Sequence, residues 1–70
     1  MMDFAQASEL IKSAGYNKTN TTSALVQYET TFSRGAEKII VSWQLGGYVK
    51  KVSIGENVFE SPEEFFKSFF

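Results

Sequence analysis

The sequence contains no cysteine and no histidine among its 70 residues. Without cysteine there is no disulfide framework, no thiolate zinc site and no nucleophilic thiol. Without histidine the chain lacks the commonest general base and the commonest metal ligand, and both usual nucleophile–base pairs are missing. These two absences predict a protein that is not an enzyme and that uses no metal or other cofactor.

Carboxylates are the remaining groups that could catalyse a reaction, and the chain has eight of them. Two carboxylates on either side of a sugar could hydrolyse a glycosidic bond. Such an enzyme needs a cleft that holds the sugar, and 70 residues leave little room for one. The adjacent pair Glu63 and Glu64 is better explained as the acidic start of a helix.

The chain also has little net charge and no long apolar run. A net charge of −1 creates no field that would attract nucleic-acid phosphates. No apolar run approaches the ~20 residues of a membrane span, and Met1-Met2-Asp3-Phe4 lacks the basic and apolar regions of a signal peptide. The sequence therefore predicts a cytoplasmic protein without membrane contact.

Aromatic residues are plentiful, with seven Phe, three Tyr and one Trp. Each aromatic ring buries about 150–250 Å², so a few of them can anchor a small core. The hydrophobic fraction of 43% and the charged fraction of 21% are typical of a folded soluble protein. We expect residues 1–70 to form a single domain.

Two helices are predicted, one near each end of the chain. In the first, Asp3 is the cap, Gly15 is the stop, and five apolar residues recur at helical spacing. These are Phe4, Ala7, Leu10, Ile11 and Ala14. In the second, Ser61-Pro62-Glu63-Glu64 has the form of a capping box with proline at the first helical position. Phe65, Phe66 and Phe69 then form one stripe.

Strands are predicted between the helices, after a polar connection at 16–22. The first runs from Ala24 to about Phe32, with Val26 and Tyr28 on one face. The second is the clearest, since Ile39, Val41, Trp43 and Leu45 alternate with polar residues. Gly46-Gly47 predicts a hairpin turn into a third strand at 48–54. Val58-Phe59 could add a short fourth strand. The order predicts an α+β two-layer sandwich with three or four antiparallel strands and both helices packed on the sheet.

Four apolar residues fall outside the predicted core. Alternation places Leu25, Ile40 and Val49 on the outer sheet face, where they would form a patch across adjacent strands. Phe70, the last residue, falls off the centre of the helical stripe. Because a contiguous exposed apolar patch usually marks a contact site, these four are the candidate partner-binding residues.

Nucleic-acid binding is the alternative. The order helix–three strands–helix resembles that of double-stranded-RNA-binding domains. Their second helix begins with basic residues that meet phosphates, whereas Ser61-Pro62-Glu63-Glu64 is acidic here and would repel them. A nucleic-acid contact would therefore use the central hairpin, through Arg34, Lys38, Lys50 and Lys51. Alternation places Lys50 and Lys51 on opposite faces, so they would not form one basic stripe, and solvated strand lysines explain them better.

Together these observations favour a small non-catalytic module that binds or regulates another protein, or that pairs with a second copy of itself. Its size, its acidity and its lack of cysteine are typical of accessory proteins of bacteria and their phages, including enzyme inhibitors. Nucleic acid is the less favoured partner.

Overall fold

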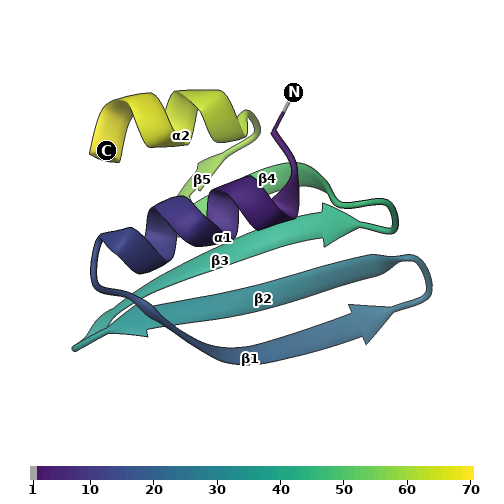
Figure 1. Cartoon of the computed structure of the whole chain (residues 1–70), viewed down its shortest axis with the longest axis horizontal. Helices are drawn as coiled ribbons and strands as arrows, with labels where there is room; N and C mark the ends of the chain where they lie inside the picture. Colours follow the sequence, from purple (N-terminus) through teal and green to yellow (C-terminus); the bar gives the residue numbers. More distant parts are fainter. Residues whose placement is uncertain (1) are drawn as a thin grey trace.

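The computed structural model describes residues 2–70, which form two helices and five strands (Figure 1). The elements are α1 (Phe4–Ser13), β1 (Asn17–Ala24), β2 (Gln27–Arg34), β3 (Glu37–Gln44), β4 (Tyr48–Ile54), β5 (Asn57–Phe59) and α2 (Pro62–Phe69). The predicted α+β class is confirmed. The sheet has five strands where the sequence predicted three or four, so the likeness to the three-stranded order of double-stranded-RNA-binding domains does not hold.

Both helices begin at the caps that the sequence indicates. The carboxylate of Asp3 accepts a hydrogen bond of 2.8 Å from the backbone N–H of Gln6. Ser61 accepts one of 3.3 Å from the N–H of Glu64, and Pro62 occupies the first turn of α2. These side chains satisfy N–H groups that lack a partner in the first turn of a helix.

The sheet is an antiparallel meander in which each strand pairs with its neighbour in the sequence. The pairing of β3 with β4 shifts between Ser42 and Trp43. Ser42 faces Lys51, whereas Trp43 faces Val49, so Lys50 is an extra residue in β4. Because of this extra residue, the side chains before the bulge lie on the opposite face from the one that uninterrupted alternation would give them.

The core lies between the helices and one face of the sheet. Ile11 of α1 and Phe65 of α2 are fully buried together with Phe32, Val41 and Val52 from the central strands. The helices lie over β4 and its neighbours, and Figure 1 shows β1 and much of β2 extending beyond them. Part of the helix-side face therefore remains uncovered.

Strand β1 occupies the segment that was predicted to be a polar connection. All eight of its residues are exposed, so it buries no apolar side chain that could have produced a strand pattern. It is held by antiparallel pairing with β2, from Asn17 opposite Ser33 to Ala24 opposite Gln27. The first predicted strand is consequently displaced, because Ala24, Leu25 and Val26 end β1 and form the turn before β2.

The packing of β1 predicts its dynamics. Because no side chain of β1 is buried, only its backbone pairing with β2 and the hydrogen bonds of Thr19 and Thr21 to that strand oppose the cost of ordering it, about 1–2 kcal/mol per residue. We expect its amides to exchange with solvent faster than those of Ile39 and Val41 in β3, by at least tenfold. Native-state hydrogen exchange followed by NMR measures this difference, and equal protection of β1 and β3 would contradict it.

Candidate partner-binding surface

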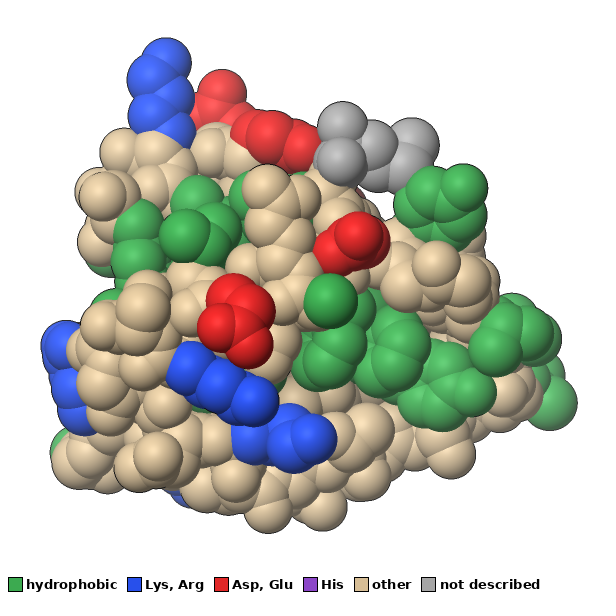
Figure 2. All heavy atoms as spheres, in the orientation of Figure 1, with side chains coloured by type: hydrophobic (Ala, Val, Ile, Leu, Met, Phe, Trp, Pro, Cys, Tyr) green, Lys and Arg blue, Asp and Glu red, His purple; other side chains and the backbone are tan. Residues whose placement is uncertain are grey.

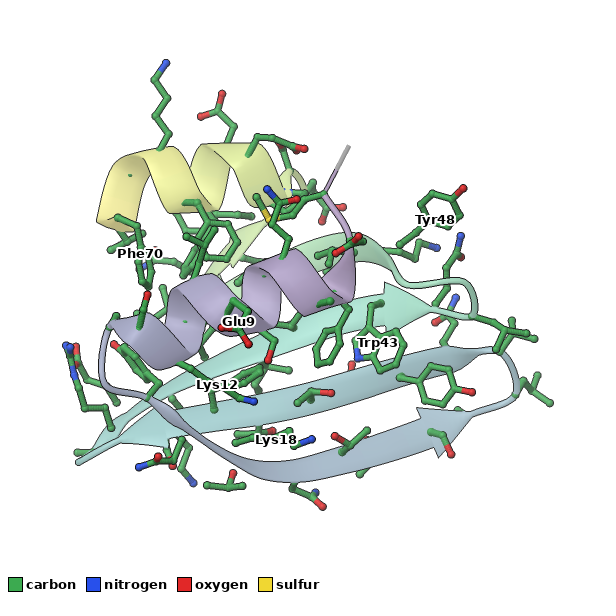
Figure 3. The ribbon with its side chains drawn as sticks, viewed as in Figure 1. Glu9, Lys12, Lys18, Trp43, Tyr48 and Phe70 are labelled. Carbon is green, nitrogen blue, oxygen red and sulfur yellow. The ribbon has the colours of Figure 1, made fainter. Side chains whose placement is uncertain are left out.

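The four apolar residues that the sequence singled out lie in four separate places. Leu25 is in the β1–β2 turn at one end of the sheet, and Ile40 is in the middle of β3 on the outer face. Val49 lies in the core. Phe70 is at the opposite end of the molecule from Trp43 and Tyr48 (Figure 3), where its ring contacts Phe65 and Phe66.

The predicted position of Val49 on the outer face is wrong. Its side chain is only 6% exposed and packs in the core beside Met2 and Val52. The cause is the bulge at Lys50, which brings Val49 onto the same face as Val52 although their positions differ by three, an odd number that regular alternation would place on opposite faces. The patch of Leu25, Ile40 and Val49 therefore does not form.

A different group of apolar residues is exposed where the β1–β2 and β3–β4 turns meet. We name Leu25, Val26 and Leu45 the apolar tip. Leu25 is 99% exposed, Val26 55% and Leu45 65%. The backbone N–H of Leu45 donates a hydrogen bond of 2.8 Å to the carbonyl of Val26, which fixes the two turns side by side. Leu45 was predicted to continue the buried face of β3, but that strand ends at Gln44.

The backbone of Leu25 has a conformation that a leucine rarely adopts. Its φ is +61°, in the left-handed region where a Cβ costs roughly 1–2 kcal/mol. Three two-residue turns of this sheet have a positive φ at their first residue, and the other two carry Gly35 (φ +61°) and Gly55 (φ +58°) there. Fold stability favours glycine at this position and does not explain the exposed leucine.

A stack of three aromatic rings, Phe4, Trp43 and Tyr28, adjoins the apolar tip. The Trp43 ring lies 4.3 Å from that of Phe4 and 4.5 Å from that of Tyr28, centroid to centroid. Its indole N–H donates a hydrogen bond of 3.0 Å to the hydroxyl of Thr30, which is fully buried. All three rings of this ring stack are partly exposed, so they present a rigid aromatic surface.

The strand–turn–strand segments that carry the apolar tip are uncharged, and a carboxylate, that of Asp3, lies beside the β3–β4 turn and the ring stack. Residues 20–28 and 39–49 form the two strand–turn–strand segments at this end, and neither contains Asp, Glu, Lys or Arg. Figure 2 shows hydrophobic side chains running from the middle of the visible face to this end of the molecule. Few charges together with exposed Tyr and Trp are characteristic of the centre of protein–protein interfaces. The uncharged stretches were visible in the sequence, but only the pairing of the strands shows that they meet.

The residues of the nucleic-acid alternative do not form one surface. The guanidinium of Arg34 donates a 2.8 Å hydrogen bond to Glu37 and another to the carbonyl of Ala14, and it lies over the ring of Tyr16. Through the first bond it lowers the pKa of Glu37, and its own pKa is raised. Arg34 thus links α1 to the β2–β3 turn. Lys38 faces Ser33 near the same end of the sheet.

Lys50 and Lys51 lie together, contrary to the alternation that placed them on opposite faces. Both line a shallow hollow of about 240 Å³ on the sheet, because the bulge at Lys50 interrupts the alternation. Glu29 and Glu60 line the same hollow. These carboxylates offset the charge of the lysines, so the hollow is not a basic site for phosphate.

The described residues contain no group of three or more carboxylates placed to hold a metal ion. Within residues 2–70 every buried side-chain nitrogen or oxygen atom has a hydrogen-bond partner, so the polar groups of the core are satisfied structurally. Neither of the two described helices has the length and hydrophobicity needed to cross a membrane.

Comparison with known proteins identified no relative, since no protein-family model, curated protein or solved structure matches this chain. Inference about function therefore rests on the geometry and chemistry of its surface.

Proposed function

We propose that this domain is a non-catalytic protein-binding module that contacts its partner through the apolar tip and the adjoining ring stack. The observation that carries the proposal is Leu25. A fully exposed leucine in a conformation suited to glycine lowers the stability of the free domain. Such a residue is explained if its side chain enters an apolar hollow of a partner.

The energies are consistent with an anchor residue. Burying a leucine side chain contributes about 1.5–3 kcal/mol, which corresponds to roughly 10–100-fold in affinity. Val26 and Leu45 can add to this contribution. The ring stack brings further apolar area at little cost in side-chain entropy, because contacts on both faces of Trp43 already hold it in place.

The chemistry of the surface also defines the partner. A tip built on two uncharged strand–turn–strand segments fits an apolar depression, and complementary charge is not required. Binding at this surface should change little with salt concentration. In contrast, binding to nucleic acid through the lysines would weaken steeply with added salt.

The substitution Leu25→Asn tests the proposal, because its effects on stability and on binding have opposite signs. Asparagine tolerates a positive φ better than leucine does, so the variant should be more stable by about 1 kcal/mol. Loss of the apolar side chain should weaken partner binding by at least tenfold. Thermal unfolding measures the first effect. Quantitative affinity capture from a lysate of the native organism, at two salt concentrations, measures the second.

Val58→Asn is the matched control, since Val58 is also an exposed aliphatic residue but lies in β5, away from the tip. We expect a set of proteins that wild type and Val58→Asn retain equally and that Leu25→Asn loses. Equal capture by all three chains would refute the proposed site. Capture that disappears at high salt would indicate binding through charged residues instead of through the apolar tip.

A further inference from the structure

The free edge of β1 is the second surface of this molecule that lacks a partner. β1 is the first strand in the sheet order and pairs on one side only, with β2. Along the other side, alternate residues direct their backbone N–H and C=O groups away from the sheet. Such a row of groups is a template for one more strand.

The two edges of this sheet are protected to very different degrees. At the other edge, β5 has only three residues and leads directly into α2. β1 has eight residues, and its first part is protected by Lys18 and by an irregularity in pairing between Lys18 and Asn20. The remaining stretch, Asn20–Ala24, has no charge, no proline and no register shift. Sheets usually prevent edge pairing with a charged residue, a proline or an irregular register, and this stretch lacks all three.

We propose that β1 pairs with the β1 strand of a second copy of this chain, antiparallel about a two-fold axis near Thr22, to form a continuous ten-stranded sheet. The Asn20–Ala24 stretches of two copies are neutral, so their pairing opposes no like charges. With Thr22 facing Thr22, Lys18 of each copy lies opposite the β1–β2 turn of the other, and the two lysines remain far apart. This two-fold arrangement uses the same surface on both copies and closes after two.

The charge and composition of β1 favour a second copy over a segment of another protein. The stretch Asn20–Ala24 offers main-chain hydrogen bonds but few features that would select a foreign strand, because its side chains are small and uncharged. An identical strand matches it in length and polarity. The association uses backbone groups of Asn20–Ala24 and buries no side chain of the apolar tip, so its failure would leave the proposed partner site untouched.

Sedimentation velocity on the full chain, from micromolar to millimolar concentration, tests this proposal. We expect a monomer–dimer equilibrium for wild type. Thr22→Lys should weaken the dimer at least tenfold, because a lysine on the edge strand opposes pairing. The variant should stay folded, since Thr22 is exposed and faces Glu29 of β2. Ser68→Lys adds the same charge at an exposed position of α2 and should leave the dimer unchanged.

Cross-linking provides a second measurement that does not depend on Thr22→Lys. The chain has no cysteine, so Thr22→Cys introduces a single thiol at the proposed two-fold axis. Under mild oxidation it should form a disulfide-linked dimer much faster than Ser68→Cys does. A wild-type chain that is monomeric throughout, a dimer unaffected by Thr22→Lys, or equal cross-linking of the two cysteine variants would each overturn the proposal.

Discussion

Phe65→Ala is expected to remove most of the stability of this domain. Phe65 is fully buried, and its ring lies 5.0 Å from that of Phe66, 5.3 Å from Phe69 and 5.6 Å from Phe59. Truncating a buried phenylalanine costs about 3–5 kcal/mol. At 0.05–0.15 kcal/mol per residue, a domain of this size has a total stability of about 3–10 kcal/mol. A large fraction of the variant should therefore be unfolded at room temperature.

Urea unfolding followed by circular dichroism measures this loss, with Phe69→Ala as the control. Phe69 belongs to the same helix and contacts the same Phe59 ring, but it is 49% exposed. Its truncation should cost less than half as much, because exposed surface loses little on removal. If the two variants were equally unstable, α2 would contribute through its whole aromatic face instead of through one buried ring.

Val49→Asp is the second change with a large expected effect, and it tests the bulge in β4. Val49 is 6% exposed, so an aspartate there would place an unpaired carboxylate in the core. Leaving an uncompensated charge buried costs about 3–5 kcal/mol. Ile40→Asp is the matched control, because Ile40 is 36% exposed on the outer face, and we expect it to cost about 1 kcal/mol or less.

The pH dependence of Val49→Asp gives an additional check. Burial would raise the pKa of the new carboxyl group in the folded state above the value of about 3.9 in the unfolded chain. The penalty should therefore be complete at neutral pH and should shrink as the pH falls through the folded-state pKa. Equal destabilisation by Val49→Asp and Ile40→Asp, independent of pH, would show that β4 follows regular alternation instead.

Sequence alone located the elements whose causes are local. The capping groups of Asp3 and Ser61 act on backbone groups within the next few residues, so they are readable from the order of amino acids. The same is true of β3, where Ile39 and Val41 alternate with exposed residues and both are buried. Helix starts, the clearest strand and the α+β class were therefore predictable.

The candidate surfaces, in contrast, were decided by tertiary structure. β1 is a strand because β2 offers it a row of backbone partners, and this pairing does not require any apolar pattern in residues 17–24. One extra residue at Lys50 moved Val49 from the predicted outer face into the core. The apolar tip exists because two turns, 20 residues apart in the sequence, are joined by the hydrogen bond from Leu45 to Val26.

The sequence by itself determined that cysteine and histidine chemistry is absent, and it contained the local signals for both helices. The sequence did not determine the setting of Leu25, because its exposure and its positive φ arise only when β1 and β2 pair in one register. Local chemistry acts over a few residues and can be read in order along the chain. Strand register is a contact between distant segments, and it decides which apolar residues of the sheet and its turns face solvent.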